Sequence, residues 1–516
     1  MLCKEGPDGP AAARSPVSTV RCMSRTETIA TTTHSRFTRT RVAAAIGVAL
    51  ALMPQIMPIQ AASAAPQEDV QGWLDEVVAS GVPAIAVVVT HGNEIAVEAG
   101  AGQVDGRPVD EHTSFRIESL SKSFTATAVM QLVEEKRVDL DVPVTQYLPD
   151  LRLDDERAES ITVRQLLNQS SGISDATLGF DQYAAGPQTP REAGELLSRS
   201  RLAFDPGTDW AYSNPNYWIC AQLIEKVSGQ DLDTYLQQNI LNPLGMDETT
   251  SASTSGQVQG APGHAQAYGA PVRVTGPDSW VAGAGGVTST AHDLGIWLRF
   301  QHGVLPGGGE VLSTAMRDEM HRRQAPEGGL YALGWYSGPP ADGGVERVSH
   351  SGVGAGTGAY QGLFPGETGI AVLQASSAPD PYEIAASLYE ASSTGELQGP
   401  PSAPGPGRDI VITLVTIALL SLCTRGIVRS ARWARRLGKI RAAITVGIGA
   451  VVAAVLFTVP VWGSAILGRA ATWPILFAAA PIPVIAVLAV AVGVGLLTIA
   501  RLAHLIACVA TDQHGQ

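Results

Sequence analysis

Three long apolar segments in the C-terminal part of this chain constrain its fold most. They cover about residues 410–428, 442–467 and 473–500. A run of about 20 apolar residues can cross a bilayer as a helix, and within lipid a helix is the structure that bonds all of its own backbone polar groups. The sequence therefore predicts a membrane domain with three transmembrane helices over residues 409–516. Arg425 lies near enough to the end of the first segment to reach the membrane interface.

A strongly basic loop separates the first two apolar segments. Residues 425–441 hold seven Lys and Arg side chains, whereas the next loop holds only Arg469. Because loops rich in Lys and Arg stay in the cytoplasm, we expect the 425–441 loop and the C-terminus on the cytoplasmic side. The residues before the first segment then lie outside. Membrane-crossing helices on both sides of the loop argue against a nucleic-acid-binding patch.

The first 65 residues have the order of a secretory signal. Three arginines between 36 and 41 precede an apolar run at 42–53, and small residues at 62–64 offer a cleavage site. This order predicts that residues 1–65 are an export leader. Translation from Met23 and an uncleaved N-terminal anchor are alternatives that stay open. Each of them sends the next part of the chain across the membrane.

Residues 66–398 have the pattern of a globular domain, and a Pro/Gly-rich linker at 399–408 separates it from the apolar segments. Strand patterns occur near both ends of this domain and helix patterns lie between them. This order predicts an α+β domain whose two ends share one antiparallel sheet. The expected strands are 84–90, 94–99, 334–336, 346–350, 359–364 and 369–374, and the expected helices are 70–79, 115–133, 161–171, 217–228, 231–241, 291–300 and 382–389.

Charge and cysteine content narrow the functional classes. The formal net charge is −13 although the 425–441 loop is basic, so the globular domain is markedly acidic. An acidic domain is a poor binder of nucleic acid, and we expect no nucleic-acid partner. Cys220 is the one cysteine of this domain, so no disulfide framework is expected there. His264, His292, His302 and His321 show no ligand spacing, so a metal site is not expected. No other cofactor is expected.

A candidate nucleophile lies in the stretch 115–126, within Ser119-Leu-Ser-Lys122. Residues three apart share a face of a helix, so the Lys122 amine is expected one turn from the Ser119 hydroxyl. An amine held beside a hydroxyl in a partly dry pocket can take its proton and activate it. About two such tetrapeptides arise by chance in a chain of this length, so the pattern needs support from other motifs.

Two later motifs supply that support, Tyr212-Ser213-Asn214 before a predicted helix and His350-Ser351-Gly352 at the end of a predicted strand. In this order the three motifs resemble those of the serine β-lactamase and penicillin-binding-protein superfamily, and within it the class C-like branch of serine hydrolases. The resemblance covers about residues 70–395. It implies a β-lactamase/transpeptidase-like α+β fold, with the antiparallel sheet flanked by helices and joined by an all-helical subdomain.

The resemblance also implies a role for each motif residue. Ser119 would be the acylated nucleophile and Lys122 its proton partner. Tyr212 would act as the base if Lys122 and its surroundings stabilise the phenolate. Asn214 would hold Lys122 and the substrate amide in place through hydrogen bonds.

The strand motif would complete this site. His350 occupies the position where many relatives carry lysine. The backbone N–H groups of Ser119 and Val353 would form an oxyanion hole, and Gly352 would let the substrate approach as a strand. No separate glutamate for deacylation is evident, so water attack would also use Tyr212.

Simpler structural roles are alternatives for three of these residues. Tyr212 could be a packed aromatic, Asn214 a helix cap, and His350 a strand-end residue with both ring nitrogens satisfied. One departure from the family pattern is Glu118, where relatives more often carry a small residue. Its carboxylate would either point away from the pocket or raise the pKa of Lys122 and slow the reaction.

Together these features predict a membrane-tethered extracytoplasmic serine hydrolase that forms an acyl-enzyme. Its substrate would be an amide, ester or lactam in a small molecule or peptide, with peptidoglycan fragments among the candidates. True class C-like β-lactamase or D,D-carboxypeptidase activity stays open, as does a catalytically inactive module that binds cell-wall material or peptides. A transporter is disfavoured because three spans without intramembrane ionisable pairs offer little pathway. The same motifs are compatible with amide, ester and lactam substrates, so they do not identify the acyl group. They also predict no oligomeric state.

Overall fold

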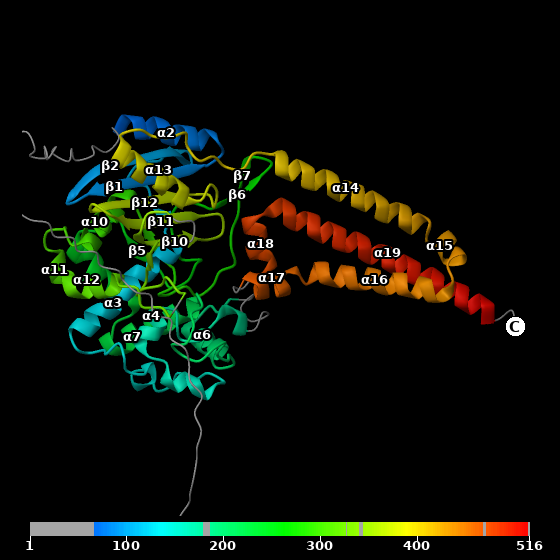
Figure 1. Ribbon diagram of the computed structural model, residues 1–516, viewed down its shortest axis with the longest axis horizontal. Helices are drawn as coiled ribbons and strands as arrows, with labels where there is room; N and C mark the ends of the chain where they lie inside the picture. Colours follow the sequence, from blue (N-terminus) through cyan, green and yellow to red (C-terminus); the bar gives the residue numbers. More distant parts are fainter. Residues whose placement is uncertain (1–66, 179–185, 327, 340–343, 468–470, 514–516) are drawn as a thin grey trace, which may run out of the picture. The chain divides into compact units, whose positions relative to one another are not determined.

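The computed structural model describes residues 67–178, 186–326, 328–339, 344–467 and 471–513 (Figure 1). The predicted leader, residues 1–65, lies outside this part of the chain. Export, cleavage and a start at Met23 therefore stay predictions.

A seven-stranded antiparallel sheet forms the centre of the globular domain. Its strands are β1 (Ala84–His91), β2 (Glu94–Val104), β3 (Arg107–Pro108), β9 (Tyr336–Gly338), β10 (Arg347–Val353), β11 (Gly358–Phe364) and β12 (Thr368–Gln374). They lie in the order β3-β2-β1-β12-β11-β10-β9, so β1 from the N-terminal end pairs with β12 from the C-terminal end. This pairing confirms the prediction that both ends of the domain share one antiparallel sheet.

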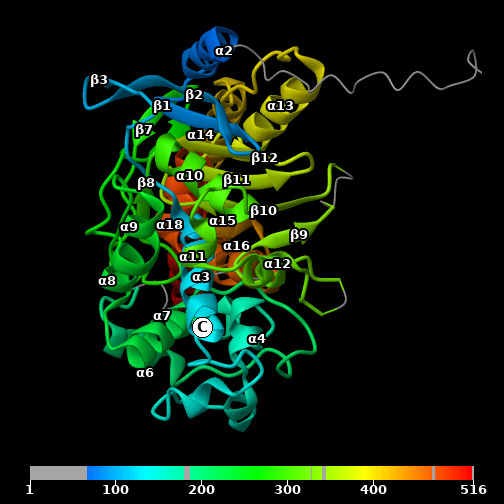
Figure 2. The same ribbon diagram turned by 90° about the vertical axis from the view of Figure 1, so that its left-hand side faces the viewer.

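The central strands are buried on both faces, which explains their nearly continuous apolar sequences. Ile85 and Val87 of β1 pack with α2 (Gln67–Ala79) and α13 (Pro381–Thr394). Ala86 and Val88 point to the opposite core, which contains residues of α10 (Ala291–His302). Figures 1 and 2 show α2 and α13 on one side of the sheet and α10 on the other.

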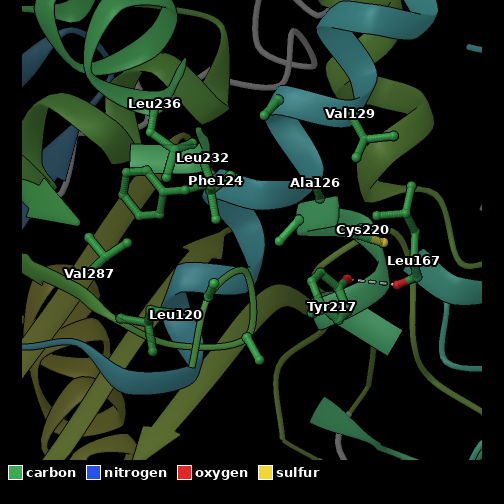
Figure 3. Close-up of a cluster of buried hydrophobic side chains, with 14 of the residues drawn as sticks. Leu120, Phe124, Ala126, Val129, Leu167, Tyr217, Cys220, Leu232, Leu236 and Val287 are labelled. Carbon is green, nitrogen blue, oxygen red and sulfur yellow. Dashed lines mark hydrogen bonds between the residues drawn. The ribbon is translucent and has the colours of Figure 1, made fainter. Parts of the chain in front are cut away.

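A helical region lies beside the sheet and is built around α3 (Ser121–Glu134) and α7 (Asn214–Ser228). Every side chain from Ser121 to Leu132 in α3 is buried. Figure 3 shows Phe124 and Val129 of α3 among buried residues that include Tyr217 and Cys220 of α7. A polar side chain near the start of α3 is therefore buried and needs hydrogen-bond partners inside the protein.

The domain also contains further short helices and strands. They are β4 (Phe115–Arg116), α4 (Val163–Leu167), α6 (Pro190–Leu197), α8 (Leu232–Leu236), α9 (Asn242–Leu244), β5 (Thr250–Ser251), β6 (His264–Ala267), β7 (Ala270–Arg273), β8 (Val287–Ser289), α11 (Gly308–Val311) and α12 (Thr314–His321).

Several helix boundaries differ from the predicted ones for local reasons. α4 begins with the predicted cap at Thr162, which forms a capping box with Gln165. The helix ends before the predicted residue 171, because Gln169 takes a left-handed backbone with φ of 64°. α7 begins three residues earlier than predicted, at Asn214, because Pro215 suits the first turn of a helix.

Among the described residues, three helices are long and apolar enough to cross a membrane, namely α14 (Gly407–Val428), α16 (Lys439–Phe457) and the Pro481–Ala510 portion of α19 (Pro481–Gln513). The second and third predicted segments are each broken, into α16 with α17 (Val459–Leu467) and α18 (Trp473–Ala479) with α19. Pro460 and Pro481 lie just after these breaks, where the missing N–H and the proline ring disfavour a continuous helix. The basic loop contains a short helix, α15 (Ser430–Arg436).

Candidate active site

Ser119 lies in a 3₁₀ turn, η1 (Glu118–Leu120), directly before α3. The backbone of Glu118 has a left-handed φ of 50°, so the chain bends sharply between β4 and α3. Ser121 fixes this bend, because its hydroxyl donates to the Glu118 carbonyl at 2.6 Å and accepts from the Val287 N–H at 3.1 Å. The Ser119 side chain is half-buried at the surface of the helical region.

Lys122 is completely buried one turn further along α3. Its Nζ donates to Ser119 Oγ at 3.1 Å, to Asn214 Oδ1 at 2.9 Å and to the Ala284 carbonyl at 2.7 Å. An ammonium group carries three N–H donors, so these three acceptors match the charged form of the side chain. The predicted proximity of Lys122 to Ser119 and Asn214 is present in the structure.

Tyr212 lies two residues before the first residue of α7 and contacts the Ser119 hydroxyl. Its phenol donates to Ser119 Oγ at 2.8 Å. Lys122 Nζ lies 4.9 Å from the centre of the Tyr212 ring. Ser119 Oγ is therefore within hydrogen-bond distance of both a lysine ammonium and a tyrosine hydroxyl, which is the arrangement that the three motifs predict.

A buried polar network supports the turn that carries Tyr212. Gln169 Oε1 accepts from the Ser213 N–H at 3.0 Å and from Asn216 Nδ2 at 2.6 Å. Ser213 Oγ donates to the Asp175 carboxylate at 2.9 Å. The sequence motifs do not predict this network. Its one signal is a run of four polar residues directly after α4, which periodicity alone does not assign to a site.

The glycine-rich loop before β8 brings a main-chain oxygen into the site. Gly283 has a φ of 78°, and a Cβ at this position would collide with the Tyr217 carbonyl oxygen. Glycine therefore lets the loop lie directly against α7. The Gly283 carbonyl accepts from Thr125 Oγ1 at 2.8 Å, and the next carbonyl, that of Ala284, accepts from Lys122. A glycine-rich sequence of this kind fits a close approach and a plain connecting loop equally well, and no sequence pattern marks Ala284.

The end of β10 lies against the nucleophile turn. A Cβ on Gly352 would collide with the Ile117 carbonyl oxygen, so glycine is needed for this approach. In the described part of the chain, β9 pairs with residues 347–349 of β10 and does not extend along residues 351–353. The side chain of Val353 is 66% exposed at the end of this edge. The end of β10 therefore lies against the turn that holds Ser119.

His350 lies on the same strand, but its ring is buried, with 2% exposed. Nε2 is 2.8 Å from the Tyr331 hydroxyl and Nδ1 is 2.7 Å from the Ser351 carbonyl oxygen. Both ring nitrogens of His350 therefore have an oxygen partner within hydrogen-bond distance. Burial raises the pKa of Tyr331 well above its ordinary value, so its hydroxyl stays protonated. The rings of His350 and Tyr331 each lie 6.1 Å from that of Tyr212. No sequence pattern marks Tyr331.

Metal-binding side chains do not gather into a group of three or more anywhere in the described residues. Two of the histidines make hydrogen-bond contacts with other side chains. His292 Nδ1 is 3.1 Å from Glu98 Oε1, and His321 Nε2 is 2.9 Å from Gln301 Oε1. Burial lowers the pKa of His321 to about 3, so its ring is neutral at ordinary pH.

A comparison with protein families decides the identity of the globular part. The family model described as Beta-lactamase matches residues 70–393, which is more than half of the chain. The chain belongs to the beta-lactamase family. This membership confirms the resemblance seen in the three motifs and the β-lactamase/transpeptidase-like fold that it implies.

Individual relatives of this beta-lactamase-family protein agree with the assignment. Protein flp of Staphylococcus aureus is 25% identical over 266 residues, covering 50% of this chain and 53% of the relative. The chain thus spans about half the length of these flp relatives. Esterase EstB of Burkholderia gladioli is 28% identical over 285 residues, covering 48% of this chain and 71% of EstB. The solved octameric penicillin-binding protein homologue from Pyrococcus abyssi matches with a TM-score of 0.53 and 27% identity, covering 67% of this chain and 81% of that one.

Proposed function

We propose that this protein is a membrane-tethered extracytoplasmic serine hydrolase that works through an acyl-enzyme on Ser119. The observation that carries the proposal is the position of Ser119 Oγ, 3.1 Å from Lys122 Nζ and 2.8 Å from the Tyr212 hydroxyl. A serine nucleophile needs one group that takes its proton and another that stabilises the charge formed by that transfer. Membership of a family that includes an esterase relative supports hydrolytic chemistry.

Acylation uses Tyr212 as the proton carrier. Tyr212 reacts as the phenolate, which the Lys122 ammonium stabilises; in this form the hydrogen bond to Ser119 is reversed and the Ser119 hydroxyl donates to the Tyr212 oxygen. Tyr212 then takes the Ser119 proton while Oγ attacks the substrate carbonyl carbon. The N–H groups of Ser119 and Val353 hold the negative oxygen of the tetrahedral intermediate. Tyr212 then gives its proton to the leaving amine or alkoxide, and the bond to that group breaks. The acyl group stays on Ser119.

Deacylation repeats these steps with water. Tyr212 takes a proton from the water as its oxygen attacks the acyl carbon. When the second tetrahedral intermediate collapses, Tyr212 returns this proton to Ser119 Oγ and the acid product leaves. Asn214 orients Lys122 through its 2.9 Å hydrogen bond, while His350 supports the site indirectly by fixing Tyr331 beside Tyr212.

The acyl donor in this proposal is an ester, an amide or a lactam in a small molecule or peptide. The edge of β10 beyond its pairing with β9 at residues 347–349 suits a substrate that lies along it as an added strand. An esterase with 28% identity over 71% of its own length favours esters as the first class to test. Peptidoglycan-derived peptides stay candidates because the proposed location is outside the membrane.

A substrate panel tests this function on the full-length protein in detergent. Short-chain p-nitrophenyl esters, peptides ending in D-Ala-D-Ala and a chromogenic cephalosporin represent the three classes. We expect turnover of at least one class, and we expect Ser119→Ala to lose roughly 10³-fold or more of it, as removal of a nucleophile does. Turnover that persists in Ser119→Ala would remove Ser119 from the reaction. Binding of a D-Ala peptide without any turnover would instead establish the binding-module alternative.

Membrane attachment in this proposal comes from α14, α16 and α19. Their length and composition indicate membrane association. The extracytoplasmic position of the hydrolase domain rests on the order of the leader and on the basic loop at 425–441.

A further inference from the structure

The side chain of Glu118 joins the nucleophile turn to the turn that follows β10. Its Oε1 accepts a hydrogen bond from Thr357 Oγ1 at 2.8 Å. The Thr357 carbonyl in turn accepts from the Gly354 N–H at 3.1 Å, which closes the turn between β10 and β11. One side chain therefore connects the residue before Ser119 with the turn that begins directly after Val353.

The turn after β10 is shaped around this glutamate. A Cβ on Gly354 would overlap the Glu118 carboxylate, and a Cβ on Gly352 would lie 3.1 Å from the Glu118 Cβ. Thr357 itself is 3% exposed, so its hydroxyl is withdrawn from water and depends on this acceptor. The two glycines leave room for the Glu118 carboxylate, and the buried Thr357 hydroxyl donates a hydrogen bond to it. The carboxylate is therefore held in one position.

The backbone of Glu118 has a conformation that is energetically unfavourable for any residue other than glycine. Its φ of 50° lies in the left-handed region, which costs a non-glycine residue roughly 1 kcal/mol. Glycine would take this conformation without that cost. The hydrogen bond to Thr357 supplies a physical reason for a glutamate where a small residue would relieve strain.

We propose that the Glu118–Thr357 hydrogen bond is a positioning contact for the oxyanion hole. It fixes the Ser119 N–H, one residue beyond Glu118, relative to the Val353 N–H, one residue before the closed turn. This inference rests on the proposed acyl-enzyme function. It gives Glu118 a role that differs from the effect on Lys122 considered from the sequence.

The test uses paired substitutions at both ends of the contact in the full-length protein. Thr357→Val removes the donor and keeps the side-chain shape, whereas Thr357→Ser keeps the hydroxyl. Glu118→Gly removes the acceptor and also relieves the backbone strain, whereas Glu118→Gln keeps an acceptor oxygen. Thr145→Val is the matched control, because it removes a hydroxyl whose hydrogen bond goes to the Glu159 carbonyl instead.

The readouts are kinact and KI for labelling of Ser119 by a fluorophosphonate, with the melting temperature of each variant. Loss of a whole oxyanion donor costs roughly 10²- to 10³-fold, and a misplaced donor should cost less. We expect kinact to fall about 10- to 100-fold in Thr357→Val and Glu118→Gly, with KI within about threefold of wild type. Thr357→Ser, Glu118→Gln and Thr145→Val should label at close to the wild-type rate. Relief of strain predicts that Glu118→Gly melts no lower than Thr357→Val.

The outcomes separate this inference from the proposed function. If wild-type Ser119 is not labelled, the acyl-enzyme proposal fails and the positioning role falls with it. If the wild type is labelled and Thr357→Val and Glu118→Gly label equally fast, only the positioning role is overturned. A slower rate that comes with a raised KI or a lower melting temperature, and that Thr357→Ser does not rescue, would also overturn it in favour of a purely structural contact.

Discussion

Replacing Tyr212 with phenylalanine removes one oxygen atom from the proposed site and leaves the packing of the ring unchanged. The lost atom makes the 2.8 Å hydrogen bond to Ser119 Oγ. The ring would still lie beside Lys122, whose Nζ is 4.9 Å from the ring centre. The substitution therefore isolates the proton-carrying oxygen from the shape of the pocket.

Two magnitudes separate a structural role from a chemical one. A single hydrogen bond is worth about 1 kcal/mol, which corresponds to about a fivefold change in rate if Tyr212 only holds Ser119 in place. Loss of a general acid and base costs a further factor of roughly 10² to 10⁴. We therefore expect kcat to fall about 10³-fold in Tyr212→Phe, while the melting temperature changes by about 2 °C or less.

The assay is steady-state hydrolysis of whichever substrate class the wild type accepts, with thermal unfolding measured on the same preparations. Tyr147→Phe is the matched control, because its hydroxyl accepts from the Asp139 N–H at 2.9 Å in a different part of the domain. This control should keep wild-type kcat. A decrease of less than about tenfold in Tyr212→Phe would refute the reasoning, since a lost hydrogen bond alone would account for it.

Three further expectations follow from the geometry. Gly352→Ala should slow acylation at least about tenfold because its Cβ would collide with backbone before Ser119, whereas Gly194→Ala, at an open position in α6, should keep the wild-type rate; equal rates would contradict this. Burial lowers the pKa of His321 to about 3, below its ordinary value near 6.5, so the stability it contributes is complete above about pH 6.5 and is lost as the pH falls towards 3. Urea unfolding should show the wild type losing about 2 kcal/mol more than His321→Gln between pH 6.5 and about pH 5, and parallel profiles would count against this. In a cysteine-free background of intact cells, an impermeant maleimide should label Ser393→Cys and not Arg432→Cys, and the reverse pattern would invert the proposed topology.

The sequence predicted the sheet and the main motif contacts because both depend on local patterns. Alternating and continuous apolar strands at the two ends of the domain identified β1, β2, β11 and β12. The three-residue spacing between Ser119 in η1 and Lys122 in α3 was enough to place these two side chains together. The family resemblance then supplied the long-range contact of Ser119 with Tyr212, which periodicity alone does not determine.

Contacts that depend on main-chain atoms or on distant loops were not predictable in this way. Ala284 accepts a hydrogen bond from Lys122 through its main-chain carbonyl oxygen, so the identity of its side chain does not predict the contact. Tyr331 and Thr357 lie on loops where neither spacing nor composition distinguishes them from surface residues. The second and third apolar segments read as continuous in hydropathy, and prolines near residues 460 and 481 broke each into two helices.

The central claim is that a covalent acyl group forms on Ser119, and mass spectrometry of the trapped enzyme tests it most directly. The full-length protein is mixed with an accepted substrate, or with a slowly deacylating analogue of the same class, then quenched in acid and digested. We predict that the peptide containing Ser119 gains the mass of the acyl group and that Ser119→Ala gains none. An acyl adduct on another residue, or wild-type turnover with no adduct on Ser119 under conditions where deacylation is slow, would contradict the account.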